Sequence, residues 1–207
     1  MQKIWQCVRK LFFLITYVSL NLSFKIEIKG RENIPNLPSA LIVANHTSYL
    51  DVFVIGSALF NNLAKIKWVI SKENYRLWFF KWIYAIYPVI VVNGTVEKIK
   101  PVLVKNHWVV IFPDGANRWC RSDKNFSAKR YTGTAVVALT TGVTVVPVKI
   151  SGADKALTPE SFKLNRQYPI TVTIGKPFKF EVVQPPSIEE AILQKTIEEI
   201  MERINVN

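Results

Sequence analysis

The sequence is poor in cysteine and histidine. It contains 2 cysteines, Cys7 and Cys120, and 2 histidines among 207 residues. No CxxC pair and no Cys/His spacing typical of zinc is present, so we expect no metal. One possible disulfide is weak evidence for an oxidising compartment, and two free thiols in a cytosolic protein fit the composition better.

Acidic residues are scarce as well. The chain has 15 Asp and Glu against 27 Lys and Arg, which gives a formal net charge of +12. This surplus favours an anionic partner, such as phospholipid headgroups, nucleic acid or an acidic carrier protein. No nucleic-acid-binding motif and no flexible basic tail is present, so we expect no nucleic acid. An aromatic content of 12%, with 6 Trp, favours an anionic membrane surface.

The sequence also lacks an apolar run long enough to cross a bilayer. Three cations precede residues 11–24, an uncharged stretch with four polar side chains, whereas a spanning helix needs about 20 apolar residues. No small-x-small cleavage site follows. We predict that residues 1–24 form an interfacial or shallowly inserted helix, although a plain core helix remains an alternative. The membrane contacts expected from this segment are Leu11, Phe12 and Phe13.

A second candidate for membrane contact is the aromatic segment at residues 75–87. It carries seven aromatic side chains and two cations, and amphipathic rings gather at lipid–water interfaces. Packing in a core is the alternative interpretation. With the basic charge, the two segments predict a peripheral or shallowly inserted protein on the cytoplasmic face of the cell membrane. The expected contacts from this segment are Trp78, Phe79 and Trp82.

Hydrophobic patterning predicts an α/β fold. Apolar runs typical of strands alternate with helical patterns, which indicates a mixed, largely parallel sheet covered by helices on both faces. No internal repeat or linker is present, so residues 25–207 should form a single domain ending in an amphipathic helix opened by Ser187. Gly142 should end an earlier helix. The predicted strands are residues 24–29, 40–44, 66–70, 88–92, 108–112, 144–150 and 170–174; the predicted helices include 52–60 and 132–141.

The strongest candidate for a site follows the buried strand at residues 40–44. His46 and Asp51 are five residues apart, which on a continuous helix corresponds to about 500° of rotation, so they would not share a face. They meet only if His46 lies in a turn and Asp51 in the first helical turn. Sites in open α/β sheets lie at the carboxyl ends of strands, where this turn falls.

A histidine paired with a carboxylate can act as a general base. The carboxylate fixes the tautomer, and the other ring nitrogen removes a proton from a hydroxyl. No GxSxG motif supplies an enzyme nucleophile, so the hydroxyl can belong to the substrate, which is then acylated directly. The alternative is structural: Ser48 and Asp51 have capping-box spacing, and His46 would then be an ordinary turn residue.

A second candidate site follows the strand at residues 108–112. Asp114 and Gly115 form a turn in which backbone N–H groups can approach an anion. Cations that follow the turn could hold a phosphate by charge-assisted hydrogen bonds, although a solvated basic loop is the alternative. These cations include Arg118 and Arg121.

Taken in order, the motifs resemble the glycerolipid acyltransferase family, which contains the lysophosphatidic acid acyltransferases. Asn45-His46-x-Ser48-x-x-Asp51 resembles its first block, Phe112-Pro113-Asp114-Gly115 its third and Val146-Pro147-Val148 its fourth, and the likeness covers roughly residues 24–178. The resemblance implies a glycerol-3-phosphate acyltransferase-like fold. It further implies that His46 is the general base, that Asp51 orients it, and that Asp114 and Gly115 help to hold the acceptor.

The resemblance also implies the substrates. The acyl donor would be a thioester of coenzyme A or acyl carrier protein, with no cofactor, and the acceptor a lysophospholipid such as 1-acyl-glycerol-3-phosphate, giving phosphatidic acid. Asp114 stands where the family has Glu, and Arg118 stands one place later than the family's arginine. A different acceptor, such as an amino-acid-headed lysolipid, therefore stays open. Hydrolysis of a lipid by the same pair and a basic membrane-binding domain without activity are the other hypotheses.

Overall fold

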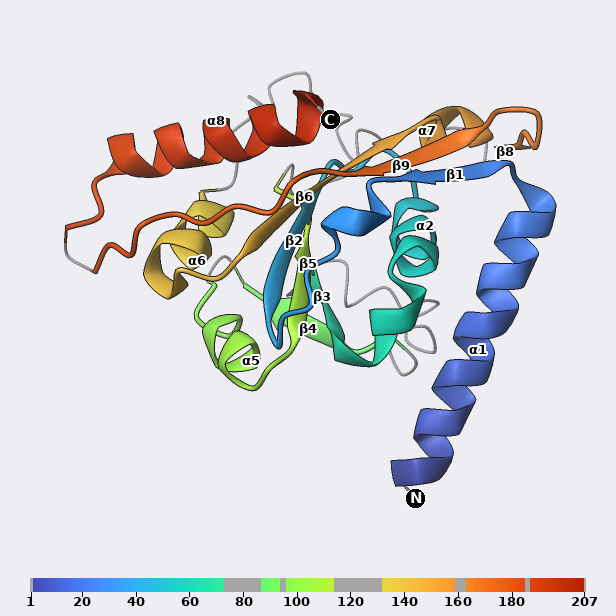
Figure 1. The fold of residues 1–207 in the computed structure, drawn as a ribbon, viewed down its shortest axis with the longest axis horizontal. Coiled ribbons are helices and arrows are strands. Elements are labelled where there is room, and N and C mark those ends of the chain that lie inside the picture. Colours follow the sequence, from blue (N-terminus) through green and yellow to red (C-terminus); the bar gives the residue numbers. More distant parts are fainter. Residues whose placement is uncertain are drawn as a thin grey trace.

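The computed structural model describes residues 2–72, 87–93, 96–113, 132–158, 163–184 and 187–206. Seven strands of this part form one sheet in the order β1-β9-β6-β2-β5-β3-β4 (Figure 1). All neighbours are parallel except β6 and β9, so the sheet is mixed and largely parallel, as predicted. The strands are β1 (Ile26–Lys29), β2 (Ala40–Ala44), β3 (Ile66–Ser71), β4 (Val89–Val92), β5 (Trp108–Ile111), β6 (Val145–Ser151) and β9 (Ile170–Ile174).

Helices cover both faces of the sheet, and β2 shows why its sequence is apolar throughout. All five residues of this central strand are buried, because alternate side chains enter two different cores. Ile42 packs in the core that contains Val54 of α2 (Asp51–Ala58). Leu41 and Val43 pack in the other core, which contains Ile197 of α8 (Glu190–Val206). The prediction of helices on both faces is confirmed.

The remaining short elements complete the two layers. The side of the sheet with α2 also carries α1 (Gln2–Ser23) and α7 (Ala153–Ala156), and the side with α8 carries α5 (Lys100–Val104) and α6 (Gly133–Thr141). Gly142 ends α6 in the left-handed conformation, with φ of 58°, as its position in the sequence predicts. The 3₁₀ turns η1 (Arg31–Asn33) and η2 (Phe60–Lys65) precede β2 and β3, and β7 (Leu157–Thr158) pairs with β8 (Lys163–Leu164).

The N-terminal helix α1 packs one side against the α/β body. Its Phe13 and Leu20 are buried, with 7% and 8% of their surface exposed. The Phe13 ring meets Tyr87 edge to face at 4.8 Å, and Phe12 meets the same ring at 6.0 Å. Burial raises the pKa of the Tyr87 hydroxyl, although a hydrogen bond with the Thr16 side chain opposes this shift.

This packing corrects the expectation that Phe13 contacts a membrane, because its ring is already enclosed by the protein. Phe12 is half-buried beside it, whereas Leu11 is 58% exposed. A helix packed on a domain has its lipid-accessible side chains on the opposite face. None of the helices in the described part of the chain has the length and apolar character that crossing a bilayer requires.

The packing of α1 predicts a contrast between two adjacent residues. Phe13→Ala should lower the free energy of unfolding by about 3–5 kcal/mol, because it empties a filled aromatic site. Leu14→Ala, the matched control, should change it by less than about 0.5 kcal/mol, since Leu14 is 46% exposed. Urea unfolding of the two purified variants measures both values. An equal loss in the two variants contradicts the packed arrangement of α1.

Candidate active site

His46 and Asp51 meet at the turn between β2 and α2. The Nδ1 atom of His46 lies 2.9 Å from Oδ2 of Asp51. The strand ends at Ala44, and Asp51 is the first residue of the helix. This is the strand–turn–helix geometry that the five-residue spacing requires. Because the turn follows a central parallel strand, the pair lies at the carboxyl edge of the sheet.

The Asp51 carboxylate is buried and also organises the turn. Its Oδ2 atom accepts hydrogen bonds from the backbone N–H groups of Thr47, at 2.6 Å, and Ser48, at 2.8 Å. The Ser48 hydroxyl accepts a hydrogen bond from the Leu50 N–H group at 3.2 Å. The capping interpretation and the catalytic interpretation therefore do not exclude each other, because the oxygen that caps the turn also faces the histidine.

The hydrogen bonds assign the tautomer of His46. Oδ2 of Asp51 accepts from two backbone N–H groups, so it also acts as the acceptor for His46, and Nδ1 carries a proton. In the neutral ring the other nitrogen, Nε2, is then unprotonated and can accept a proton. The Asp51 side chain is 0% exposed and that of His46 is 16% exposed. The imidazole therefore remains open on one side to an incoming molecule.

The ring of Phe112 fixes the plane of the imidazole. It stacks on His46 with 4.1 Å between ring centroids and 18° between planes. Phe112 directly follows β5, which pairs with β2, so both rings come from neighbouring strand ends. The sequence supplied Phe112 as part of a motif, but its contact with His46 could not be read from it.

Asn45 links the residue before His46 to the neighbouring strand β6. Its amide Nδ2 donates to the carbonyl of Ile150 at 2.8 Å, and its Oδ1 accepts from the Ile150 N–H group at 2.7 Å. These two bonds join the end of β2 to the end of β6 and fix the backbone that precedes His46. The partners are 105 residues apart, so no local signal in the sequence could have identified this clamp.

Seven residues predicted from the sequence lie outside the described residues: Asp114, Gly115, Arg118, Arg121, Trp78, Phe79 and Trp82. In the described part of the chain, no three His, Cys, Asp or Glu side chains gather in a group that could hold a metal. The site shown by the described residues is therefore the pair of His46 and Asp51, with Phe112 and Asn45 supporting the histidine.

The fold and the site define a class of protein: an α/β domain with a histidine–carboxylate pair after a parallel strand. The family whose profile matches residues 25–151 is described as Acyltransferase. This match spans more than half of the chain, and the chain belongs to the acyltransferase family.

Curated relatives point in the same direction. The chain is 28% identical over 170 residues to a chloroplastic 1-acyl-sn-glycerol-3-phosphate acyltransferase of Arabidopsis thaliana, covering 77% of this chain and 45% of that protein. It is 27% identical over 145 residues to a 1-acyl-sn-glycerol-3-phosphate acyltransferase of Pseudomonas aeruginosa, covering 66% of this chain and 53% of that protein. The chain thus spans about half the length of these relatives.

A solved structure has the same fold. The 1-acyl-sn-glycerophosphate acyltransferase of Thermotoga maritima superposes with a TM-score of 0.59 at 23% sequence identity, covering 94% of this chain and 76% of that one. At this identity the likeness concerns the fold, and it confirms the expected α/β architecture.

Proposed function

We propose that the chain transfers a fatty acyl group from a thioester donor, acyl-CoA or acyl carrier protein, to the free hydroxyl of a lysophospholipid. The acceptor proposed first is 1-acyl-glycerol-3-phosphate, which gives phosphatidic acid. The observation that carries the proposal is the hydrogen bond of 2.9 Å between His46 Nδ1 and the buried Asp51 carboxylate. It leaves Nε2 of a partly open imidazole as the base.

The reaction is written without a covalent enzyme intermediate. Nε2 of His46 takes the proton of the acceptor hydroxyl while the oxygen of that hydroxyl attacks the thioester carbonyl carbon. The tetrahedral intermediate collapses, the C–S bond breaks, and the imidazolium returns the proton to the thiolate. Asp51 stabilises the imidazolium throughout. The curated relatives bear names that match this activity.

The test is acyl transfer by the purified protein in anionic vesicles. Lysophosphatidic acid and other lysolipids are offered with either acyl thioester, and lipid products are separated and quantified. Diacyl product supports the transferase, and the preferred acceptor separates 1-acyl-glycerol-3-phosphate from an amino-acid-headed lysolipid. Free fatty acid in place of diacyl product contradicts transfer and indicates hydrolysis.

Helix α1 supports a further part of the proposal, binding to an anionic membrane surface on its cytoplasmic side. At 100° per residue, the exposed apolar side chains of α1 fall within an arc of about 120°. This stripe lies opposite the side on which Phe13 and Leu20 are buried. A helix that packs one side against the domain and leaves an apolar stripe exposed on the other suits peripheral insertion at the headgroup boundary. The stripe consists of Val8, Leu11, Leu14, Ile15, Val18 and Leu22.

Replacing two residues of the α1 stripe should release the protein from vesicles. Leu11→Gln with Leu22→Gln should lower the partition coefficient about 100-fold, since each leucine contributes more than about 1.4 kcal/mol when buried in an apolar phase. Both leucines are exposed, at 58% and 84%, so folding should be preserved.

Flotation with anionic vesicles measures this partition, and circular dichroism confirms that the fold is intact. The control is Asn21→Gln, at an exposed polar position flanking the stripe, which should float like the native protein. Undiminished flotation of the double variant contradicts membrane contact by α1. Equal binding of the native protein to neutral vesicles contradicts the role of its charge, because cations near an anionic leaflet contribute about 1 kcal/mol each.

A further inference from the structure

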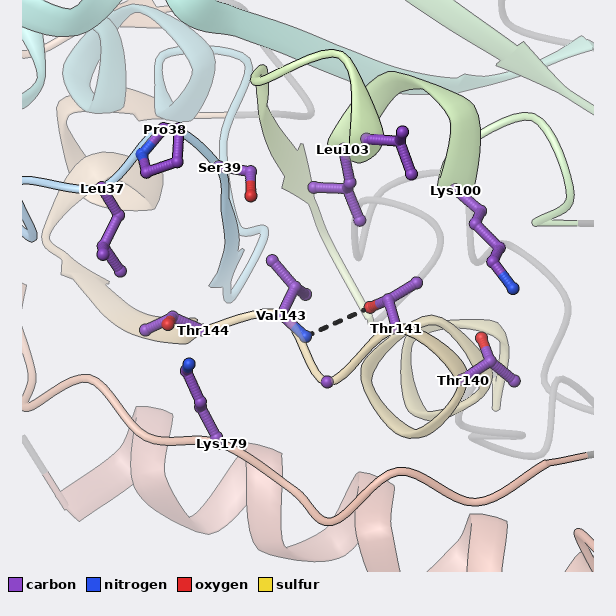
Figure 2. Close-up of a pocket in the computed structure, with 12 residues that line it drawn as sticks. Leu37, Pro38, Ser39, Lys100, Leu103, Thr140, Thr141, Val143, Thr144 and Lys179 are labelled. Carbon is purple, nitrogen blue, oxygen red and sulfur yellow. Dashed lines mark hydrogen bonds between the residues drawn. The ribbon is translucent and has the colours of Figure 1, made fainter.

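The strands β2 and β6 pair in parallel from their first residues. The N–H group of Leu41 donates to the carbonyl of Thr144 at 2.9 Å, and the pairing continues to Ala44, which lies opposite Val148. Figure 2 shows the start of this pair, where Ser39 and Thr144 directly precede the two strands and line a hollow of about 400 Å³. At this end the ladder begins with a bond between two backbone atoms, and the even-numbered residues of β6 face β2.

The register shows which bonds the next step of this ladder would contain. In parallel strands, a residue that faces its neighbour bonds to the residues before and after its partner, through evenly spaced, slanted hydrogen bonds. Because β2 ends opposite Val148, a continued ladder would place His46 opposite Ile150. The N–H group of Ile150 would then donate to the backbone carbonyl of Asn45, and its carbonyl would accept from the N–H group of Thr47.

The side chain of Asn45 takes the place of both of these backbone groups. Its Oδ1 accepts from the N–H group of Ile150 at 2.7 Å, and its Nδ2 donates to the carbonyl of Ile150 at 2.8 Å. An amide side chain can do this because it carries the same acceptor and donor as a peptide group. Both backbone groups of Ile150 are thus satisfied while the main chain at His46 leaves the sheet.

The N–H group of Thr47 shows the consequence. A continued ladder would direct it to β6, but it donates to Oδ2 of Asp51 at 2.6 Å. The same oxygen lies 2.9 Å from Nδ1 of His46. A strand that continued through Thr47 would commit this N–H group to the sheet, and the turn that brings His46 to Asp51 would be lost. The Asn45 amide therefore supports the turn in which the histidine and the carboxylate meet.

We propose that Asn45 is a positioning residue for the reaction. By replacing the next step of the ladder between β2 and β6, its amide holds the turn in the geometry that pairs Nδ1 of His46 with Asp51. Asn45 acts through the histidine and does not touch the substrates. Its expected effect on turnover rests on the acyl transfer proposed above. Its effect on the imidazole does not, because the tautomer of His46 can be observed in the protein without substrate.

The experiment is a proton–nitrogen NMR correlation of the full chain with isotope-labelled histidine. The sequence contains 2 histidines, so His107→Ala assigns both rings. The neutral ring of His46 should carry its proton on Nδ1 in the native protein. In Asn45→Ala a share of the molecules should carry it on Nε2, because the turn no longer holds the ring against Asp51. A native ring protonated on Nε2, or a folded Asn45→Ala protein with the native tautomer, overturns the proposal.

A milder variant covers the case in which Asn45→Ala does not fold. The hydroxyl of Asn45→Ser can keep one of the two bonds to Ile150, so this variant should show a tautomer mixture between those of the native protein and Asn45→Ala. In the same proteins the turnover number should fall by up to about 100-fold, the loss that misplacing a catalytic group by about 1 Å can cause. The KM for the acyl thioester should change much less.

The matched control is Asn33→Ala. Asn33 is also part-buried, and its Nδ2 donates to the carbonyl of Ile174 at 2.8 Å, but this bond reaches β9, which lies two strands from β2. The control should keep the native tautomer of His46 and a turnover number within about threefold of the native value. Equal losses of turnover in Asn33→Ala and Asn45→Ala overturn the positioning role. A tautomer change in Asn45→Ala alone, in a chain whose native form makes no diacyl product, supports the positioning of His46 and contradicts only the proposed acyl transfer.

Discussion

His46→Ala should lower the turnover number for acyl transfer by about 10³–10⁴-fold, the upper part of the range that general acid–base catalysis contributes. The alanine leaves no group that can take the hydroxyl proton, and no described side chain stands in the place of Nε2. The KM for the acyl thioester should change much less, because the imidazole acts on the proton and not on the donor. Initial rates of diacyl product formation at saturating substrate measure the effect.

The chain provides a control in its other histidine. His107 precedes β5, at the edge of the sheet opposite the candidate site. His107→Ala should therefore keep turnover within about threefold of the native value, as expected for a substitution away from the site. Comparable losses in the two variants would contradict a specific role for His46. A His46→Ala protein of native activity would contradict the assignment of His46 as the general base.

The hydrophobic pattern of the sequence was sufficient to predict the main strands and helices of the fold. The boundaries of β2 and β9 match the predicted residues 40–44 and 170–174. In β2 an unbroken apolar run fixes a strand that is buried on both faces, and in β9 apolar residues alternate with threonines, as in a strand with one fully buried face. Gly142 ends its helix as predicted. The last helix begins at Glu190 instead of Ser187. The capping spacing marked the start of the helix to within a turn and did not define its first hydrogen bond.

Contacts between residues far apart in the sequence could not be predicted from the sequence. The uncharged stretch of α1 indicated an interfacial helix, but the sequence could not show that Phe13 faces Tyr87, 74 positions away, while Leu14 faces outward. The same holds for the stack of Phe112 on His46 and for the clamp between Asn45 and Ile150. The pairing of His46 with Asp51 could be predicted because both residues lie in one turn, where their spacing limits the possible geometry.

Replacing the Asp51 carboxylate should have the second large effect on turnover. Asp51→Asn should lower turnover about 10²–10³-fold, less than His46→Ala, because the base is retained while the charge that stabilises the imidazolium is lost. The N–H groups of Thr47 and Ser48 both point at Oδ2, so the amide oxygen of the variant should occupy that position and keep Nδ1 of His46 protonated. The amide nitrogen then takes the place of Oδ1, which is buried without a hydrogen-bond partner among the described residues.

That placement predicts a stability cost of about 1–3 kcal/mol for the unpaired amide N–H groups. Ser48→Ala separates capping from catalysis, since it removes only the acceptor of the Leu50 N–H group. It should cost about 1 kcal/mol of stability and leave turnover within about threefold. Parallel urea unfolding and rate measurements decide between the two roles of the turn. If Asp51→Asn loses stability but keeps native turnover, the carboxylate is only a cap; if turnover falls in Asp51→Asn alone, the charge beside His46 acts in the reaction.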